Sequence, residues 1–299
     1  IPIIDKEDGV MAYPLLENAL GKIYFYDGAF ISANSSVAIS LLNPFEESTY
    51  YETIRFKSGV LLFLEDHLDR LVRSVSSTED FAFDVFKVRE LLCDFVVKAY
   101  DSSLPTDCNV RVVITRVHTL FYFCEANIPD KFSFINGVCT RTLNWERVSP
   151  NVKVFRGEYK EAVARAFSMQ TKFGKPYEII LSDNKGKLYE GSKSNFFAII
   201  GNEVYSAPDS KILIGITRQR VLSSLEKVGC KLVTDMFTLA ELSNMREEVA
   251  LFISSTPFDI LPIASVDDIE FSSTSNLKLQ QIMRIYSDIT NNYINDHRR

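Results

Sequence analysis

Residues 190–197 read EGSKSNFF, and residues 213–218 read LIGITR. The first stretch is predicted to lie on an apolar strand that follows a turn rich in lysine and glycine. The second ends a loop and opens an amphipathic helix, whose first backbone N–H groups lack partners within the helix and attract anions. A carboxylate on a strand and a Gly-Ile-Thr helix start together suit an anionic, nitrogen-containing cofactor.

The composition is that of an ordinary globular protein. Of its 299 residues, 46% are hydrophobic and 24% are charged, and the length allows two packed domains. The formal net charge of −6 argues against nucleic acid as a partner. No apolar run approaches the roughly 18 residues of a membrane span. No N-terminal export signal is evident, and we therefore expect a cytoplasmic protein.

Cysteine and histidine usage argues against disulfides and metals. The five cysteines are odd in number and form no C-x-x-C pair, which is typical of reduced thiols in the cytoplasm. The three histidines have no ligand spacing, so we expect no metal site.

The N-terminal part alternates apolar and polar residues as strands do. Asp27-Gly28 predicts a hairpin turn between strands at 22–26 and 28–31, and residues 57–59 predict another between 50–56 and 60–64. The remaining elements are two helices and two strands, near 64–75, 84–99, 110–116 and 120–124.

Residues 125–130 are polar, contain a proline and make the best linker. We therefore expect an N-terminal α+β domain over 1–128 and a second domain over 129–299. The second domain is predicted to contain strands and helices at 137–142, 152–155, 157–173 (helix), 178–181, 195–200, 203–205, 217–228 (helix), 250–253 and 275–292 (helix).

The two opening stretches resemble the signature of the class IV aminotransferases, the fold-type IV pyridoxal 5'-phosphate (PLP) enzymes. That family includes branched-chain and D-amino-acid aminotransferases and aminodeoxychorismate lyases. The resemblance extends from about residue 22 to about residue 266. It implies an α+β fold of two domains with PLP in the cleft between them, and a homodimer in which each pocket takes residues from the partner.

Lys153 is the candidate for the lysine that forms an imine with PLP. It alternates with two valines, so on a strand it faces away from them. The resemblance implies a lysine at the end of a strand before a helix, roughly 30 to 40 residues ahead of the pyridine acid, and Lys153 precedes Glu190 by 37 residues. Lys160 is the alternative, although it falls inside the expected helix. Without the resemblance, Lys153 would be interpreted as a solvated surface lysine.

Glu190 is the candidate that holds the pyridine nitrogen protonated. If the protein binds no cofactor, Glu190 is interpreted as a solvated glutamate at the end of a turn. By resemblance, the polar residues that follow hydrogen-bond near the phosphate or to the groups that hold the cofactor: Ser192, Lys193, Ser194 and Asn195.

Arg70 is the first candidate for the phosphate, because its segment HLDRL at 67–71 resembles the family's His-Leu/Ile-x-Arg-Leu segment. Its other reading is a solvated charge on a helix. Ile216 and Thr217 would offer N–H groups at a helix start. Ser255 and Thr256 would add hydroxyls, whereas Arg218 is more simply structural.

The substrate pocket is expected to include Tyr51, whose segment YETIR at 51–55 resembles the family's aromatic-Glu-Thr-x-Arg segment. Arg116 is expected at the end of a strand, where relatives have an arginine that recognises the substrate carboxylate. His118 could assist it or be an ordinary loop histidine.

The resemblance implies transfer of an amino group between an amino acid and a 2-keto acid by a branched-chain or D-amino-acid type of enzyme. Release of 4-aminobenzoate and pyruvate from aminodeoxychorismate is the alternative. A catalytically silent PLP-binding homologue is a third reading, supported by three departures from the family pattern. These are Arg156 in place of a common asparagine, Pro257 in place of an amide donor, and residues 47–49 in place of glycines.

Overall fold

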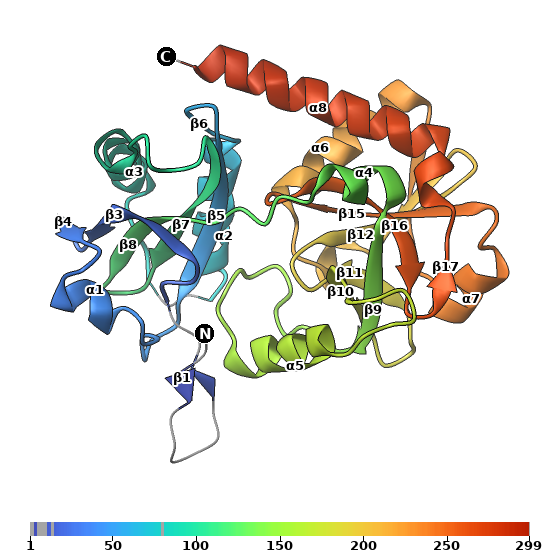
Figure 1. Ribbon diagram of the computed structural model, residues 1–299, viewed down its shortest axis with the longest axis horizontal. Helices are drawn as coiled ribbons and strands as arrows, with labels where there is room; N and C mark the ends of the chain where they lie inside the picture. Colours follow the sequence, from blue (N-terminus) through green and yellow to red (C-terminus); the bar gives the residue numbers. More distant parts are fainter. Residues whose placement is uncertain (1–2, 5–10, 13–14, 79–80, 299) are drawn as a thin grey trace. The chain divides into compact units, whose positions relative to one another are not determined.

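The computed structural model describes residues 3–4, 11–12, 15–78 and 81–298. The chain forms two compact units (Figure 1). One comprises Ile1–Ala126, Val152–Glu158 and Tyr293–Arg299, and the other comprises Asn127–Asn151 and Tyr159–Asn292. The chain first passes from one unit to the other inside the expected linker. The segment that carries Lys153 then returns to the first unit.

The first unit contains a six-stranded antiparallel sheet of order β4-β3-β8-β7-β5-β6. Its strands are β3 (Ala19–Tyr26), β4 (Ala29–Ser32), β5 (Tyr50–Lys57), β6 (Val60–Leu61), β7 (Asp107–Ile114) and β8 (Thr119–Cys124). Its other elements are the small pair β1 (Ile3–Ile4) and β2 (Met11–Ala12) and the helices α1 (Ser36–Ser40), α2 (Leu64–Ser76) and α3 (Val85–Ala99).

Both predicted hairpins are confirmed, and their turns explain them. Asp27 and Gly28 have φ of 47° and 86°, and Ser58 and Gly59 have φ of 54° and 86°. Two consecutive residues at positive φ give the turn whose twist matches that of paired strands. Asp-Gly and Ser-Gly accept this backbone at low cost.

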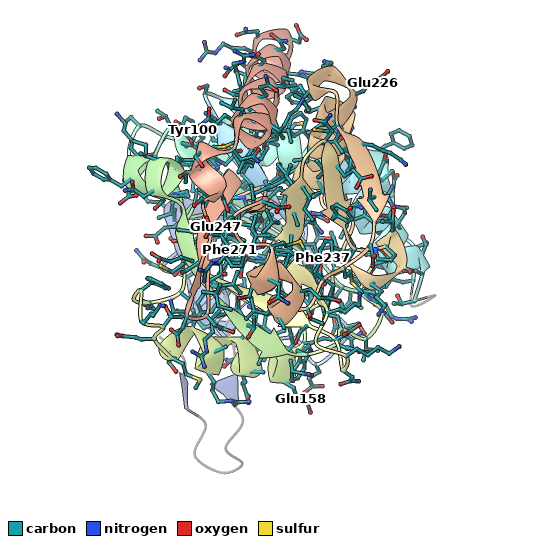
Figure 2. All side chains as sticks on the ribbon, turned by 90° about the vertical axis from the view of Figure 1, so that its right-hand side faces the viewer. Tyr100, Glu158, Glu226, Phe237, Glu247 and Phe271 are labelled. Carbon is teal, nitrogen blue, oxygen red and sulfur yellow. The ribbon has the colours of Figure 1, made fainter. Side chains whose placement is uncertain are left out.

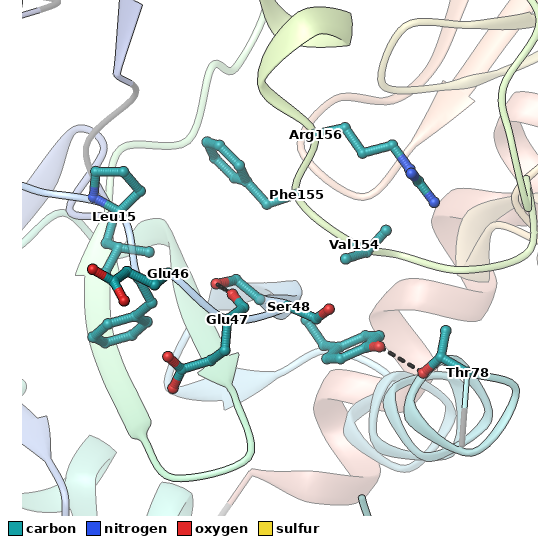
Figure 3. Close-up of a pocket in the computed structure, with 12 residues that line it drawn as sticks. Leu15, Glu46, Glu47, Ser48, Thr78, Val154, Phe155 and Arg156 are labelled. Atoms are coloured by element: carbon teal, nitrogen blue, oxygen red, sulfur yellow. Dashed lines mark hydrogen bonds between the residues drawn. The ribbon is translucent and has the colours of Figure 1, made fainter. Parts of the chain in front are cut away.

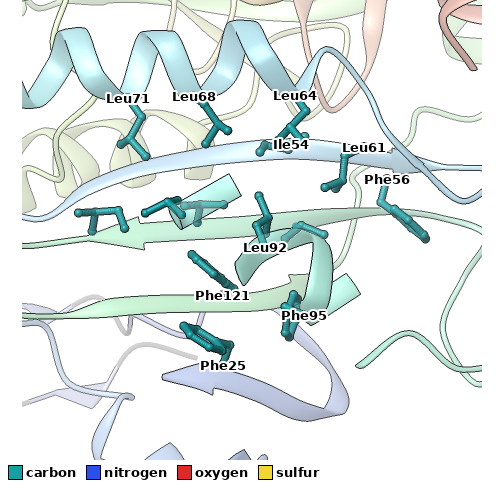
Figure 4. Packing of buried hydrophobic residues seen from close by; sticks show 14 of the residues in the cluster. Phe25, Ile54, Phe56, Leu61, Leu64, Leu68, Leu71, Leu92, Phe95 and Phe121 are labelled. Carbon is teal, nitrogen blue, oxygen red and sulfur yellow. The ribbon is translucent and has the colours of Figure 1, made fainter. Parts of the chain in front are cut away.

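Helices α2 and α3 bury the apolar face of this sheet. Figure 4 shows Leu64, Leu68 and Leu71 along the side of α2 that faces β5. Ile54 and Phe56 of β5 belong to the same buried cluster. Because strand residues alternate between faces, Glu52 shares the side of Ile54 and Phe56. A carboxylate on that side is stable only with polar partners.

The second unit is built on a nine-stranded sheet that closes on itself. The path runs β11-β10-β9-β16-β15-β12-β13-β14, and β11 also pairs with β12, so six of the strands form a barrel-like ring. The strands are β9 (Val138–Asn144), β10 (Glu178–Ser182), β11 (Leu188–Gly191), β12 (Asn195–Ile200), β13 (Glu203–Ser206), β14 (Lys231–Thr234), β15 (Val249–Ser255), β16 (Asp259–Val266) and β17 (Ile269–Glu270).

Alternate residues of these strands belong to different buried clusters. Phe196 and Ile253 join one cluster, which Phe237 and Phe271 help to enclose (Figure 2). Phe197 joins another, together with helices α6 and α8. The helices that start or lie in this unit are α4 (Lys131–Asn136), α5 (Gly157–Ser168), α6 (Ile216–Leu225), α7 (Leu239–Asn244), α8 (Leu277–His297) and the 3₁₀ turns Asp209–Lys211, Glu226–Val228 and Ser273–Ser275.

Several predicted boundaries were wrong. The helix expected over 157–173 ends at Ser168, because a turn follows in which Thr171 and Gly174 bond each other's backbone and Gly174 has φ of 113°. The strand expected over 152–155 is a single bridge between Val154 and Tyr50. Helix α4 begins just after the linker, where the Asp130 side chain accepts from the Ser133 N–H.

Candidate active site

A buried carboxylate organises the charged side chains of the first unit. Glu52 is fully buried, and its Oε1 and Oε2 accept hydrogen bonds from Nε and Nη2 of Arg70 at 2.8 and 2.6 Å. Nδ1 of His67 lies 2.8 Å from Oε2. Strand β5 supplies the acid, and His67 and Arg70 stand one turn apart on α2, which places both on the face that packs against the strand.

The electrostatics of this cluster are set by burial and by the neighbouring cations. Burial acts to raise the pKa of Glu52, but Arg70 and Lys153 outweigh it and hold that pKa well below its ordinary value. Burial lowers the pKa of His67 to about 4, so the imidazole is neutral near pH 7. A neutral ring must donate its Nδ1 proton to the carboxylate, which leaves Nε2 as an acceptor. Among the described residues, no hydrogen-bond partner meets that Nε2.

Lys153 reaches the same cluster. Its Nζ lies 3.6 Å from Oε2 of Glu52 and 5.4 Å from the centre of the Tyr51 ring. The backbone is held on both sides, because the Tyr51 N–H donates to the Lys153 carbonyl and the Lys153 N–H donates to Oγ of Ser74. The structure therefore brings Lys153, Arg70 and Tyr51 together. Lys160 lies within α5.

Arg116 and His118, the other residues expected in the substrate pocket, lie in the loop between β7 and β8, and their roles stay predictions. Arg116 is exposed in the turn after β7, beyond the strand end where it was expected. His118 lies 2.7 Å from the Asp27 carboxylate and stacks on Phe45 with 4.5 Å between ring centres.

In the first unit, Arg111 is a candidate site residue that the sequence analysis did not identify. Its guanidinium carbon lies 5.0 Å from the centre of the Tyr51 ring, and its Nη2 lies 3.6 Å from the Glu17 carboxylate. Its Nε is buried without a partner among the described residues. The sequence does show an arginine in the middle of an apolar strand. Burying such a charge costs free energy unless it is paired and hydrogen-bonded, so its position could have indicated a functional residue.

In the second unit, Glu190 ends β11 and is almost completely buried. One carboxylate oxygen accepts from the Leu213 N–H at 3.1 Å, and the other lies 3.4 Å from Nη1 of Arg147. Burial raises the pKa of Glu190 to about 7, with Arg147 and the Leu213 N–H opposing it. A further cation or N–H donor at this carboxylate would therefore favour its ionised form.

A second buried acid, Glu178 on β10, holds the turn that follows Glu190. It accepts from the hydroxyls of Ser192 and Ser194 at 2.6 and 2.8 Å. Gly191 lies within this arrangement, since a Cβ there would stand 1.9 Å from Oγ of Ser194. The sequence analysis did not identify Glu178 or Arg147 as site residues, because only their contacts in the folded chain connect them with the residues around Glu190.

The LIGITR stretch is fastened to the EGSKSNFF stretch. Nδ2 of Asn195 donates to the Leu213 carbonyl at 2.8 Å. A Cβ on Gly215 would stand 2.1 Å from Oδ1 of Asn195, so only glycine fits between them. Helix α6 begins at Ile216, and no side chain caps it. Its first N–H groups are therefore suited to an anion.

The remaining predicted phosphate residues lie at the end of β15. Oγ of Ser255 donates to the Lys193 carbonyl at 2.6 Å, and Thr256 opens the tight turn into β16. Arg218 is buried, and its Nη2 lies 2.9 Å from the Asp209 carboxylate. That pairing suits a structural role.

A cavity of about 450 Å³ lies in the first unit beside the segment that follows Lys153 (Figure 3). Residues 44–50 and 154–156 line it, together with Leu15 and Thr78. Glu47 and Arg156 give it side chains of both charges.

The described side chains include no group of three or more His, Cys, Asp or Glu placed to hold a metal ion. Within the described ranges, every helix is too short or too polar to traverse a lipid bilayer.

Comparison with known proteins identifies the family of this chain. Residues 49–266 match the amino-transferase class IV family. A Methanocaldococcus jannaschii protein, named provisionally as a branched-chain-amino-acid aminotransferase, is 29% identical over 73% of this chain and 78% of its own. The D-alanine aminotransferase of Bacillus licheniformis is 26% identical over 73% and 78%. The aminodeoxychorismate lyase of Bacillus subtilis is 21% identical over 86% and 92%.

The fold is shared with solved structures. The branched-chain aminotransferase of the archaeon Thermoproteus uzoniensis, solved with norvaline, superposes with a TM-score of 0.72 at 20% identity. The match covers 92% of this chain and 98% of that one. A branched-chain amino acid aminotransferase solved with pyridoxamine 5'-phosphate gives a TM-score of 0.73 at 18% identity, over 93% of this chain and 98% of its own.

Proposed function

Because this chain belongs to the class IV aminotransferase family, we propose that it is a PLP-dependent aminotransferase that moves an amino group between an amino acid and a 2-keto acid. The observation that carries the proposal is the position of Lys153 beside the buried Glu52–Arg70 pair. A lysine held by backbone bonds on two sides next to a buried cationic group is an organised nucleophile.

The donor groups present fit PLP. Glu190 is a buried carboxylate whose pKa of about 7 lets it ionise against a ring nitrogen. The uncapped start of α6, with Ile216 and Thr217, suits the phosphate. The close contact of Gly215 with Asn195 keeps the start of this helix in place. Arg70, Ser255 and Thr256 would add phosphate donors. Ser192, Ser194 and Asn195 would support this site through Glu178 and Leu213.

When bound, PLP supplies a protonated ring that accepts electron density from the substrate Cα. Lys153 would hold the cofactor through its Nζ, and the substrate amine would displace it. The freed Nζ would then take the proton from the substrate Cα as general base. Glu190 would keep the ring nitrogen protonated through its carboxylate.

The substrate carboxylate requires a cation near Lys153. We assign this role to Arg111 ahead of Arg116, because Arg111 shares the Tyr51 ring with Lys153 and has a partnerless buried Nε among the described residues. Tyr51 would then form the pocket wall. Arg111→Lys should raise KM for the amino acid more than it lowers kcat, because lysine keeps the charge but loses the planar fork.

Lysis of aminodeoxychorismate is the second candidate. The relative that carries this name matches over 92% of its length, and both reactions would use Lys153. The two are separated by their products, because transfer requires a keto-acid acceptor and lysis releases pyruvate without one.

Covalent trapping tests the proposal. The protein is incubated with PLP, reduced with borohydride, digested and analysed by mass spectrometry, with Lys153→Ala and Lys160→Ala in parallel. We expect the label on Lys153 and unchanged labelling in Lys160→Ala. A wild-type protein that takes no label, or takes it elsewhere, would refute the assignment. Panels of amino acids with and without 2-oxoglutarate, and of aminodeoxychorismate alone, then identify the reaction.

A further inference from the structure

Two segments proposed to hold the phosphate come from different parts of the second unit. One is the start of α6 at Ile216 and Thr217, and the other is the turn between β15 and β16 that carries Ser255 and Thr256. A phosphate bound by both requires them to keep a fixed separation, because a displacement of about 1 Å at a binding group is enough to weaken a site severely.

The C-terminal helix supplies a hydroxyl that reaches both segments. Tyr286 of α8 is buried, and its hydroxyl donates to Oδ1 of Asp259 at 2.9 Å. Asp259 is the first residue of β16 and pairs with Ser255 across the turn. The side chains of Thr217 and Thr290 lie beside the same hydroxyl, where each acts to lower the pKa of Tyr286 against the larger effects of burial and Asp259.

The surroundings hold the ring of Tyr286 still. It packs in the apolar cluster that joins α6 and α8 to the sheet, with Val221 of α6, Ile260 of β16 and Ile282 of α8. Asp259 adopts φ of 59°, a left-handed conformation that aspartate tolerates better than most residues. The hydrogen bond from Tyr286 holds its side chain in that turn.

We propose that Tyr286 is a positioning residue that fixes the start of α6 relative to the β15–β16 turn and thereby sets the phosphate site. Burial and the Asp259 carboxylate raise the pKa of Tyr286 well above its ordinary value, so the hydroxyl stays a donor throughout the working pH range. The inference rests on the proposed function, since it assumes that these segments bind the phosphate of PLP.

The test compares PLP with pyridoxal, which has the same ring and aldehyde but no phosphate. Dissociation constants of both are measured by absorbance titration for the wild type, Tyr286→Phe and Tyr205→Phe. Tyr205 is the matched control, because its hydroxyl also donates to a carboxylate, that of Glu203, and because it lies on β13, outside both phosphate segments. We expect Tyr286→Phe to weaken PLP about tenfold and pyridoxal less than twofold, whereas Tyr205→Phe changes neither.

Variants at Asp259 separate positioning from general stability. Asp259→Asn keeps an oxygen that can accept from Tyr286 and should retain PLP affinity. Asp259→Ala should match Tyr286→Phe, and the double variant should be no weaker than either single one, because both remove the same bond. Equal losses for PLP and pyridoxal, or additive losses in the double variant, would overturn the inference.

Failure of the inference is distinguishable from failure of the proposed function. A wild-type protein that binds PLP no better than pyridoxal has no phosphate site, which contradicts the proposed function itself. A wild-type preference for PLP that survives in Tyr286→Phe leaves the function intact and removes only the role of Tyr286.

Discussion

At the scale of single residues, Glu190 makes the stability of the cofactor-free protein depend on pH. Its pKa of about 7 in the folded chain exceeds the ordinary value of 4.5. The protonated form therefore favours folding. The contribution of protonated Glu190 to the unfolding free energy is fully present below about pH 4.5 and is lost as the pH rises through 7. The difference corresponds to about 3 kcal/mol.

We predict that Glu190→Gln removes this dependence, because glutamine is neutral at every pH. Urea unfolding of the cofactor-free wild type and variant is compared at intervals from pH 5 to pH 8. The wild type should lose about 3 kcal/mol of unfolding free energy relative to the variant over this range. Parallel curves would show that Glu190 does not titrate there.

Glu52 is the residue on which the buried charges of the first unit depend. Glu52→Gln replaces a carboxylate that accepts from Arg70 and His67 with a neutral amide, and it leaves the guanidinium buried without its counter-charge. We predict a loss of about 3–5 kcal/mol in unfolding free energy, measured by chemical denaturation.

Asp107→Asn is the matched control for Glu52. It breaks another carboxylate–arginine pair of the same sheet, with Arg55, but Asp107 is 25% exposed and water can replace it. The loss should therefore be clearly smaller than for Glu52→Gln. Equal losses in the two variants would contradict the larger cost expected for breaking the more deeply buried pair.

At the scale of elements, the start of α6 depends on a glycine. A Cβ at residue 215 would stand 2.1 Å from Oδ1 of Asn195, which in turn holds the Leu213 carbonyl. We predict that Gly215→Ala displaces α6, costs about 1–3 kcal/mol of stability and weakens PLP at least tenfold. Gly157→Ala is the control, because no atom lies within 4 Å of a Cβ there. A normal PLP affinity in Gly215→Ala would show that α6 does not bind the phosphate.

The best predicted elements were those specified by a few residues adjacent in the sequence, such as turns and helix caps. Asp27-Gly28 and Ser58-Gly59 specify their hairpins within two residues, and the predicted 84–99 helix is capped by Asp84 and forms as α3. The segment around Lys153 was less predictable. Its extended backbone is held by Tyr51 and Ser74, which are about 80 to 100 residues away in sequence.

At the scale of the whole molecule, cofactor binding should raise the resistance to unfolding. A ligand that binds only the folded state at 100 times its Kd adds about 2.7 kcal/mol. We predict that PLP raises the Tm of the wild type and raises that of Lys153→Ala much less, as followed by calorimetry. An equal rise in both would show that PLP binds without Lys153. The expected homodimer stays a prediction, for which light scattering should give twice the 34.0 kDa chain mass.

The sequence by itself determined the family, the hairpins and the segments on which Lys153, Arg70 and Glu190 lie, because these depend on patterns that are contiguous along the chain. Only the tertiary structure decided which polar groups meet. It placed Arg111 beside Tyr51, joined Glu178 to Ser192 and Ser194, and paired Glu52 with Arg70. The physical reason is that a buried charge or hydroxyl must find its partner in space. That partner is selected by packing between strands and helices far apart in sequence.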